Sequence, residues 1–299
     1  MVGPTASGKS RLAEALASSI SAQIFSVDSM QVYRGMDIGT AKPDRSARDR
    51  FGYHLVDLVD PADELTVAEY QAIGAPILDR LTADERPAVL AGGSGLHLRA
   101  LVDPLEFPPT DDELRSQLEA LASRDLLEEL TEADPGAGEV VDLANPRRVL
   151  RAVEVYRLTG DTPSSRVQSP KAVAVSEYAP ARPFVGIGID AGPDLERRAA
   201  ARLDDMLDRG LFDEVAGLSS TMGRTARKAV GYQQLLSVIA GDISLEEGRQ
   251  RAIRATVALA KRQRTFFRRD PRIHWIPWHH EPDERLQAAL SHLEESWTS

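Results

Sequence analysis

The chain begins with a phosphate-binding pattern, which constrains its fold more than any other feature of the sequence. The pattern G-x-x-x-x-G-K-[ST] is met in full by Gly3, Pro4, Thr5, Ala6, Ser7, Gly8, Lys9 and Ser10. Its two glycines allow the backbone to wrap around an anion, and the helix that follows directs its positive end at the same anion. Lys9 adds a charge, and Ser10 offers a hydroxyl to a Mg²⁺ that bridges phosphate oxygens. The pattern predicts an α/β, P-loop NTPase-like parallel sheet with a site for a polyphosphate and Mg²⁺. The alternative is a glycine-rich turn that binds nothing.

Composition excludes several classes of protein. The 299 residues are enough for one large domain, or for one domain with an insertion. The sequence has no cysteine, so disulfides, thiolate metal sites and cysteine nucleophiles are excluded. No apolar run approaches the roughly 18 residues of a membrane span, and no signal-peptide pattern is present, so we expect a cytoplasmic protein without a membrane partner. Nothing in the sequence demands a dimer, and we expect a monomer.

Two further features qualify these expectations. The net charge of −10 argues against a generic nucleic-acid binder. Only Met1 and Val2 precede the phosphate-binding pattern, where a strand of about five residues is usual. Either the first strand is shortened or the true start lies upstream.

A carboxylate follows the first complete strand that the sequence predicts. Ile24, Phe25 and Val27 are typical of a strand, and this strand ends at Asp28. In open α/β sheets, functional residues lie at the carboxyl ends of the strands, so we expect Asp28 to lie over the phosphate site. Such an aspartate can act as a general base or as an outer ligand of Mg²⁺. The alternative is that it caps the next helix.

The next predicted strand, residues 87–91, ends in a glycine pair instead of an acid. A hydrolytic P-loop NTPase usually has an acidic residue there to help hold Mg²⁺, so the pattern disfavours an ATPase or GTPase and leaves a kinase open. Gly92 and Gly93 would let the backbone approach a ligand closely, and Ser94 could donate to a phosphate or a base. Between these strands, residues 54–60 resemble another short strand, and Thr66 with Glu69 predicts the start of a helix that runs to about Leu81.

A mostly helical insertion interrupts the α/β core. The composition changes near residues 106–110, and residues 184–190 resume the sheet, so we assign residues 1–108 and 183–299 to the core and 109–182 to the insertion. Within the insertion, Asn145 and Pro146 predict a helix start. Arg147, Arg148 and Arg151 gather near that end. They are either solvent-facing charges or contacts to an RNA backbone.

The most basic stretch lies near the C-terminus, in residues 249–272. It holds Arg249, Arg251, Arg254, Lys261, Arg262, Arg264, Arg268, Arg269 and Arg272 against one acid, Asp270. The alternative to RNA binding is a solvated helix face. The six histidines show no metal-ligand spacing, and we expect His279 and His280 to form a surface pair.

Several stretches together resemble the bacterial tRNA dimethylallyltransferases, also called isopentenyl-diphosphate:tRNA transferases. They are residues 3–10, 28–43 (Asp-Ser-Met-Gln-Val-Tyr-Arg-Gly-Met-Asp-Ile-Gly-Thr-Ala-Lys-Pro), 92–96 (Gly-Gly-Ser-Gly-Leu), 145–148 (Asn-Pro-Arg-Arg), 230–232 (Val-Gly-Tyr) and 261–263 (Lys-Arg-Gln). The resemblance covers nearly the whole chain, and the second stretch is its most specific part. Two positions depart from the family pattern: Ser94 stands where threonine is common, and His97 where tyrosine is common.

The resemblance implies transfer of a dimethylallyl group from dimethylallyl diphosphate to N6 of adenosine 37, beside the anticodon of a tRNA. Asp28 would receive the N6 proton, and Thr5 and the loop amides would hold the diphosphate, with Ser10 on Mg²⁺. The flipped adenine would lie against Asp28, Ser29, Met30 and Gln31. The tRNA would contact Ser94, Arg115 and the stretch that holds Arg147, Arg148 and Arg151, and the insertion would hold the anticodon stem-loop.

Elementary chemistry agrees with this implication. An adenine amine is a weak nucleophile, so its attack on an allylic carbon needs proton removal and a leaving group whose growing charge is neutralised. Three rival readings remain open at this point. They are a P-loop kinase for a nucleotide or small metabolite, a prenyltransferase for free adenylate, and a binding protein without activity.

Overall fold

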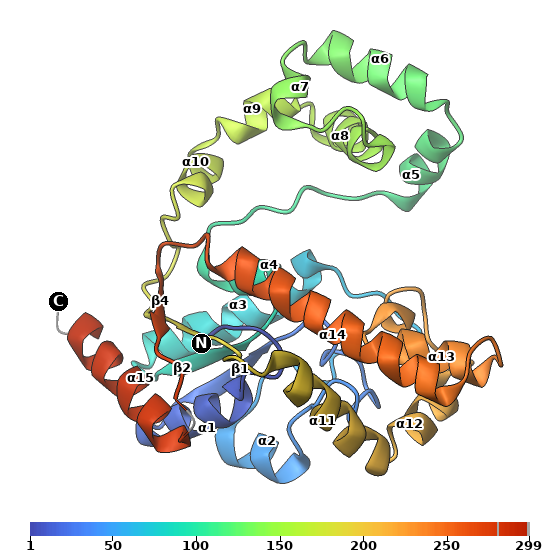
Figure 1. Cartoon of the computed structure of the whole chain (residues 1–299). Helices are drawn as coiled ribbons and strands as arrows, with labels where there is room; N and C mark the ends of the chain where they lie inside the picture. The colour runs from blue at the N-terminus through green and yellow to red at the C-terminus, as the bar shows by residue number, and fades with distance from the viewer. Residues whose placement is uncertain (280, 298–299) are drawn as a thin grey trace. The chain divides into compact units, whose positions relative to one another are not determined.

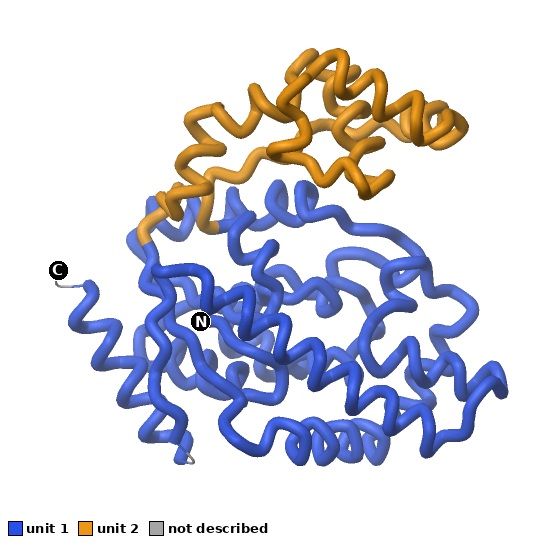
Figure 2. The backbone as a smooth tube through the Cα atoms, turned by 45° about the horizontal axis from the view of Figure 1, so that its top comes forward, with its two compact units in different colours: residues 1–101, 184–299 blue, residues 102–183 orange. Residues whose placement is uncertain are grey.

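The structure, a computed structural model, describes residues 1–279 and 281–297, so the predicted surface pair at His279 and His280 lies partly outside the described residues. The chain divides into two compact units (Figure 2): unit 1 is residues 1–101 with 184–299, and unit 2 is residues 102–183. The sequence placed these boundaries at 108/109 and 182/183. The backbone N–H of Ala181 donates to the carbonyl of Val102 at 2.8 Å, which pairs the two ends of unit 2 with each other.

Unit 1 is built around parallel strands (Figure 1). The strands are β1 (Gln23–Val27), β2 (Ala88–Gly92), β3 (Gly186–Ile189) and β4 (Ile273–Ile276). β1 pairs with β2 and β3 with β4, both in parallel register. Val2 lies between the two pairs, bridging Gly92 of β2 and Gly188 of β3, so that a single residue occupies the place of a central strand. The strands predicted at residues 24–27, 87–91, 184–190 and 273–277 are confirmed, and the coarse prediction of a mixed α/β fold holds.

Helices cover both faces of these strands. They are α1 (Lys9–Ser19), α2 (Arg45–Phe51), α3 (Val67–Ala83), α4 (Gly95–Val102), α11 (Leu195–Asp208), α12 (Leu211–Leu218), α13 (Tyr232–Ile239), α14 (Leu245–Phe267) and α15 (Pro282–Trp297), with a 3₁₀ turn at Ala226–Lys228. Successive residues of β1 point to opposite faces: Ile24 packs with α1 and α15, whereas Phe25 packs with α3 and α11 to α14. The capping box predicted at Thr66 and Glu69 is present at the start of α3.

The strand predicted at residues 54–60 is wrong. His54 makes one parallel bridge to Phe25 and Val59 makes one to Tyr33, but no strand forms between them. Leu55 and Asp57 have φ angles of 65° and 54°, which extended backbone cannot adopt. An alternating pattern of apolar and acidic residues does not reveal such turns.

Unit 2 is helical, as predicted, and has its own apolar core. Its helices are α5 (Asp112–Glu119), α6 (Ser123–Ala133), α7 (Ala137–Val140), α8 (Pro146–Thr159), α9 (Pro163–Val167) and α10 (Pro170–Ser176). Leu118, Leu126, Leu130 and Val153 are buried together where α5, α6 and α8 meet. Asn145 caps α8 by accepting a hydrogen bond from the backbone N–H of Arg147 at 3.2 Å.

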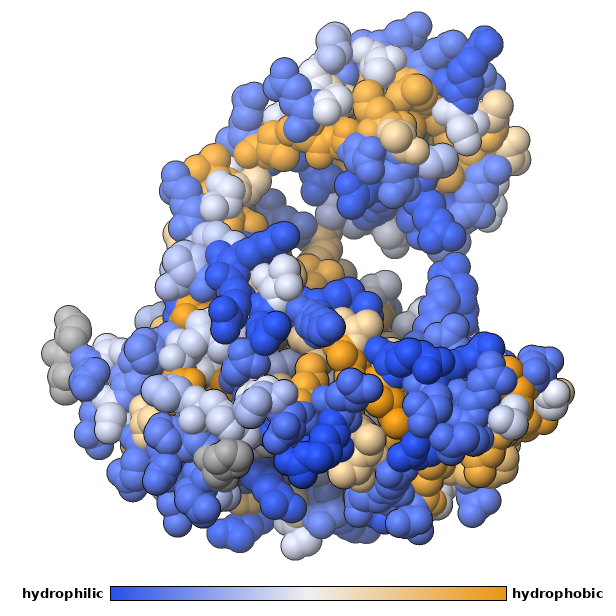
Figure 3. Space-filling view, in the orientation of Figure 1, coloured by the Kyte–Doolittle hydropathy of each residue, from blue (hydrophilic) through white to orange (hydrophobic). Residues whose placement is uncertain are grey.

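The surface is mainly polar. On the face seen in Figure 3, hydrophilic residues dominate and hydrophobic residues form separate patches. Among the described residues, no helix combines the length and the apolar character that crossing a membrane requires.

Candidate active site

The loop of residues 3–8 has the backbone shape that the phosphate-binding pattern predicts. Ala6 and Gly8 have φ angles of 60° and 82°. Left-handed residues in a turn direct successive backbone N–H groups to one side, a geometry that suits an anion. A Cβ on Gly3 would lie 2.2 Å from the carbonyl oxygen of Ile189, so only glycine fits there. Gly8 then forms the N-cap of α1, and the positive end of that helix faces the same site.

A polar cavity of about 180 Å³ lies beside this loop. Lys9, Ser10, Asp28 and Arg202 line it, and Lys9 and Arg202 are both partly buried. Burial lowers the pKa of the Lys9 ammonium to about 8; the Asp28 carboxylate opposes this shift, and the Arg202 guanidinium adds to it. Arg11 and Glu14 also line the cavity, so three cations face two carboxylates. The remaining excess of positive charge suits an anionic ligand. Ser10 is exposed to the cavity.

Asp28 lies at the carboxyl end of β1, as predicted. Its Oδ1 accepts a hydrogen bond from the backbone N–H of Met30 at 2.8 Å, and no described residue donates to its Oδ2. The helix-capping alternative is excluded, because turns follow Asp28 and the next helix, α2, begins only at Arg45. One carboxylate oxygen is thus held by the turn while the other remains available to a ligand.

A larger cavity of about 360 Å³ adjoins the first. The two share six lining residues: Thr5, Asp28, Thr40, Gly93, Arg202 and Gln263. The larger cavity adds apolar side chains, among them Leu203, Met206 and Leu259. A polar, positively charged cavity and a more apolar cavity therefore meet at Asp28.

Ser94 faces the larger cavity from the turn after β2. Its backbone N–H donates to the carbonyl of Val27 at 3.1 Å, and its Oγ lies 2.7 Å from Nδ1 of His97. His97 is 8% exposed and packs edge-on against the ring of Tyr70. Burial lowers the pKa of the His97 imidazole, with the Asp28 carboxylate opposing the shift. Ser94 and His97, the two positions that depart from the family pattern, therefore contact each other, and His97 orients the Ser94 hydroxyl.

The sequence model of the IPP transferase family matches residues 31–270. The chain belongs to the IPP transferase family. It is 44% identical over 284 residues to the tRNA dimethylallyltransferase of Streptomyces avermitilis, with 92% of this chain and 88% of that protein covered. It is 41% identical over 308 residues to that of Streptomyces griseus, with 100% and 96% covered.

Solved structures agree with the family. The tRNA isopentenylpyrophosphate transferase of Bacillus halodurans has a TM-score of 0.67 and 31% identity, covering 99% of this chain and 96% of that one. The enzyme of Staphylococcus epidermidis has a TM-score of 0.70 and 30% identity, with 99% and 97% covered. A eukaryotic dimethylallyltransferase acting on tRNA shares the fold at a TM-score of 0.73 and 21% identity, with 92% and 72% covered. None of these matches supports the kinase alternative.

In this IPP transferase, the glycine pair at the end of β2 allows close contacts within the protein. A Cβ on Gly92 would lie 1.8 Å from the carbonyl oxygen of Val27, and one on Gly93 would lie 2.3 Å from the side-chain amide of Gln263. The space at Gly93 lets Gln263 reach the phosphate loop, where its Oε1 accepts from the backbone N–H of Thr5 at 2.8 Å. The sequence pointed to Gln263 only as part of the family motif at residues 261–263, and it assigned no role to this residue.

Arg202 is the site residue that sequence reasoning missed. It lies on α11 in the stripe of Ala199, Leu203 and Met206, which spacing alone identifies as core. Burial lowers the pKa of its guanidinium, and Asp28 opposes the shift. The available signal was a charged residue on an otherwise apolar helix face, because a buried arginine needs an anionic partner.

The residues predicted to hold the adenine occupy different positions. Ser29 and Met30 line the larger cavity. Gln31 lines the smaller one, but its amide is engaged within the protein: Oε1 accepts from Ser26 at 2.7 Å and Nε2 donates to the carbonyl of Thr40 at 3.1 Å. The amide of Gln31 thus fixes the loop backbone, and its contact with a base stays a prediction.

The four arginines predicted to contact tRNA lie in unit 2. Arg115 and Arg151 both bind the fully buried Glu154, at 3.0 and 2.8 Å. Arg147 and Arg148 are exposed, and Arg148 lies 3.7 Å from Asp142. Two of the four therefore stabilise the core of unit 2, and all four stay predicted RNA contacts.

The basic stretch in unit 1 separates into paired and unpaired cations. Arg249, Arg251, Arg264, Arg268 and Arg272 form ion pairs with acidic residues. Among the described residues, no acid pairs with the exposed side chains of Arg254, Lys261, Arg262 and Arg269. Arg262 also lines the larger cavity. Arg262 therefore places an unpaired positive charge of α14 at the larger cavity.

Proposed function

We propose that this chain transfers a dimethylallyl group from dimethylallyl diphosphate to N6 of adenosine 37 in tRNA. The proposal rests on one observation: Asp28 lines both the smaller, positively charged cavity and the larger, more apolar cavity. Such a pair suits a ligand with a diphosphate at one end and a hydrocarbon at the other. Relatives that cover nearly the whole chain are named tRNA dimethylallyltransferase, which supports the choice of reaction.

The diphosphate is proposed to bind in the smaller cavity. The backbone N–H groups of residues 3–10 would surround its oxygens, in the manner of other anion-binding loops. Lys9 and Arg202 would neutralise its charge, and Thr5, which lines both cavities, would contact it as well. This arrangement stabilises the charge that grows on the leaving group as the carbon–oxygen bond breaks.

The residues at this site also fit Mg²⁺. Mg²⁺ is commonly held by one or two protein oxygens together with substrate phosphates and water. Ser10 and Asp28 supply such oxygens in one cavity, and no group of three acidic or histidine ligands occurs among the described residues. The ion would be held by Ser10 and by phosphate oxygens. Asp28 would contact it only through a bound water, as an outer ligand. Bound there, it would supply Lewis-acid neutralisation of the diphosphate.

Asp28 is proposed as the general base. In the transfer step the N6 lone pair of adenine forms a bond to C1 of the dimethylallyl group. The bond from C1 to the diphosphate oxygen breaks, and its electron pair leaves with diphosphate. N6 then carries one proton too many, and the free Oδ2 of Asp28 can accept it.

The tRNA is proposed to bind through its anticodon stem-loop. An adenine must leave its stack to enter a cavity, which costs a few kcal/mol and least in a single-stranded loop. Asp28, Ser29, Met30, Gln31 and Ser94 would surround the base. The phosphate backbone would contact Arg115, Arg147, Arg148 and Arg151 of unit 2 and the unpaired cations of α14. A monomeric state and a cytoplasmic location are part of the same proposal.

A transfer assay tests the proposal. Labelled dimethylallyl diphosphate, Mg²⁺ and unmodified tRNA with adenosines at positions 36 and 37 are incubated with the protein, beside parallel reactions with AMP and with ATP plus candidate acceptors. Label in the tRNA that is lost in Asp28→Ala, with RNA binding retained, supports both the reaction and the base. Label in AMP would identify a free-nucleotide prenyltransferase instead, and phosphate transfer from ATP without prenyl transfer would refute the reaction.

A further inference from the structure

The backbone of residues 37–42, called the segment below, forms part of the wall of both cavities. Thr40 lines both, and Gly39 lines the larger one. This segment has no regular secondary structure, so no ladder of backbone hydrogen bonds fixes it. Backbone hydrogen bonds from Ala41 to Ile38 and from Lys42 to Asp37, both 2.9 Å, close turns within the segment, and side chains connect it to the rest of unit 1.

Glu214 of α12 supplies the main attachment. Its Oε2 accepts hydrogen bonds from the backbone N–H groups of Asp37 at 3.0 Å and Ile38 at 2.8 Å, and its Oε1 accepts from Gly39 at 3.1 Å. Three consecutive amides thus converge on one carboxylate. Hydrogen bonds to an ionised acceptor are roughly twice as strong as neutral ones, so the segment is held firmly.

Tyr232, at the start of α13, completes the attachment. Its hydroxyl donates to Oε1 of Glu214, and its side chain is fully buried. A Cβ on Gly39 would lie 2.4 Å from the ring of Tyr232, so glycine allows the segment to lie directly on that ring. Burial and the neighbouring Glu214 carboxylate raise the pKa of the Tyr232 hydroxyl, which keeps it a hydrogen-bond donor.

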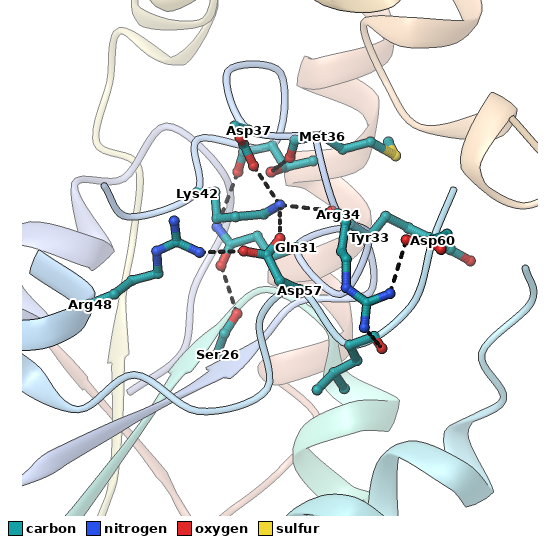
Figure 4. Close-up of polar contacts among 12 residues, drawn as sticks. Ser26, Gln31, Tyr33, Arg34, Met36, Asp37, Lys42, Arg48, Asp57 and Asp60 are labelled. Atoms are coloured by element: carbon teal, nitrogen blue, oxygen red, sulfur yellow. Dashed lines mark hydrogen bonds and ion pairs between the residues drawn. The ribbon is translucent and has the colours of Figure 1, made fainter. Parts of the chain in front are cut away.

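Lys42, at the other end of the segment, provides a second attachment (Figure 4). The Nζ of Lys42 donates to the carbonyl of Tyr33 at 2.7 Å and to carboxylate oxygens of Asp37 and Asp57, each at 2.6 Å. The Lys42 side chain is 1% exposed. Between the two anchors, the carbonyl of Thr40 accepts from Gln31, whose amide also binds Ser26 of β1. A shift of the segment would therefore be transmitted to the end of the strand that carries Asp28.

We propose that Glu214 is a positioning residue for the transfer reaction, an inference that rests on the proposed function. Glu214 lines neither cavity. By fixing the amides of residues 37–39, it sets the cavity wall at Gly39 and Thr40 and, through Gln31, the approach to Asp28. A displacement of about 1 Å in such a wall is enough to slow a reaction that depends on alignment.

Glu64 provides a matched control. It also accepts a hydrogen bond from a distant backbone amide, that of Thr225 at 3.1 Å, and binds the Thr225 hydroxyl. Glu64 does not line either cavity. Glu64→Gln therefore removes the negative charge from a comparable link between loops, at a residue outside the wall of the site.

The test compares Glu214→Gln, Tyr232→Phe and Glu64→Gln in the full chain, with single-turnover transfer to tRNA, the Kd for tRNA and the Tm as readouts. In Glu214→Gln the side-chain amide would present an N–H₂ group to backbone N–H donors, so we expect the single-turnover rate to fall by about 10- to 100-fold. The Kd for tRNA should stay within about twofold, because phosphate contacts dominate such affinities. Tyr232→Phe leaves the three amide contacts intact and should lose about three- to tenfold in rate.

Three results would overturn the proposal: an unchanged rate in folded Glu214→Gln, an equal loss of rate in Glu64→Gln, or a loss that follows the drop in Tm across all three variants. If Glu214→Gln does not fold, an unchanged rate in Tyr232→Phe overturns it as well. Absence of transfer by the wild-type protein would refute the proposed function and, with it, the positioning role. Transfer by the wild-type protein with an unchanged rate in Glu214→Gln would refute the positioning role alone.

Discussion

Binding of dimethylallyl diphosphate should weaken above pH 8, because Lys9 loses its charge there. The pKa of Lys9 is lowered from 10.5 to about 8, chiefly by burial. The ammonium is present below this pKa and disappears as the pH rises through it. If only the charged form holds the diphosphate, the Kd rises about twofold at pH 8 and about tenfold at pH 9 relative to pH 7. A lysine with an ordinary pKa would change the Kd by only about 4% at pH 9.

Calorimetric titration of dimethylallyl diphosphate with Mg²⁺, in the absence of tRNA and between pH 7 and 9, measures this effect. Lys9→Arg is the control, since a guanidinium keeps its charge throughout the range. We expect its Kd to be higher at every pH and nearly independent of pH. A wild-type Kd that stays constant up to pH 9 would refute the reasoning, and a rise that persists in Lys9→Arg would assign the titration to another group.

Further predictions concern the loop, the metal and the core of unit 2. Gln263→Ala removes the acceptor of the Thr5 amide, so the KM for dimethylallyl diphosphate should rise about tenfold; an unchanged KM would show that the loop holds its shape alone. Ser10→Ala should raise the Mg²⁺ concentration needed for half-maximal transfer, and an identical requirement would remove Ser10 as a ligand. Glu154→Gln removes the buried carboxylate from two guanidinium groups that are 39% and 30% exposed, and urea unfolding should show a loss of about 2 kcal/mol. The exposed Glu128→Gln should cost less than about 1 kcal/mol, and equal losses would contradict the argument.

Local sequence patterns predicted the elements whose structure depends on near neighbours. The phosphate loop, the strand before Asp28 and the caps at Thr66 and Asn145 all follow from residues within a few positions of one another. The strand predicted at residues 54–60 failed because its turns depend on backbone angles that side-chain alternation does not report.

The site was predicted only in part, for a related reason. Asp28 and Lys9 belong to local motifs, and the sequence brought both to the phosphate site. Arg202 and Glu214 lie on helices near residue 200, far from the phosphate loop in the sequence, and helical spacing there is the same for a core residue and a site residue. The family resemblance implies that Gln31 contacts the base; the structure adds that its amide binds Ser26 and Thr40, and the contact with a base stays a prediction.

The sequence by itself determined the chemistry available to this protein: an anion-binding loop, a carboxylate at a strand end and a family resemblance that runs through the chain. The tertiary structure alone decided which distant groups complete the site, because a cavity forms only when segments far apart in the chain pack together. It brought Arg202 to Lys9 and Asp28, Gln263 to Thr5 through the space at Gly93, and Glu214 to three amides of the cavity wall. Each of these contacts joins residues more than a hundred positions apart, beyond the reach of any local pattern.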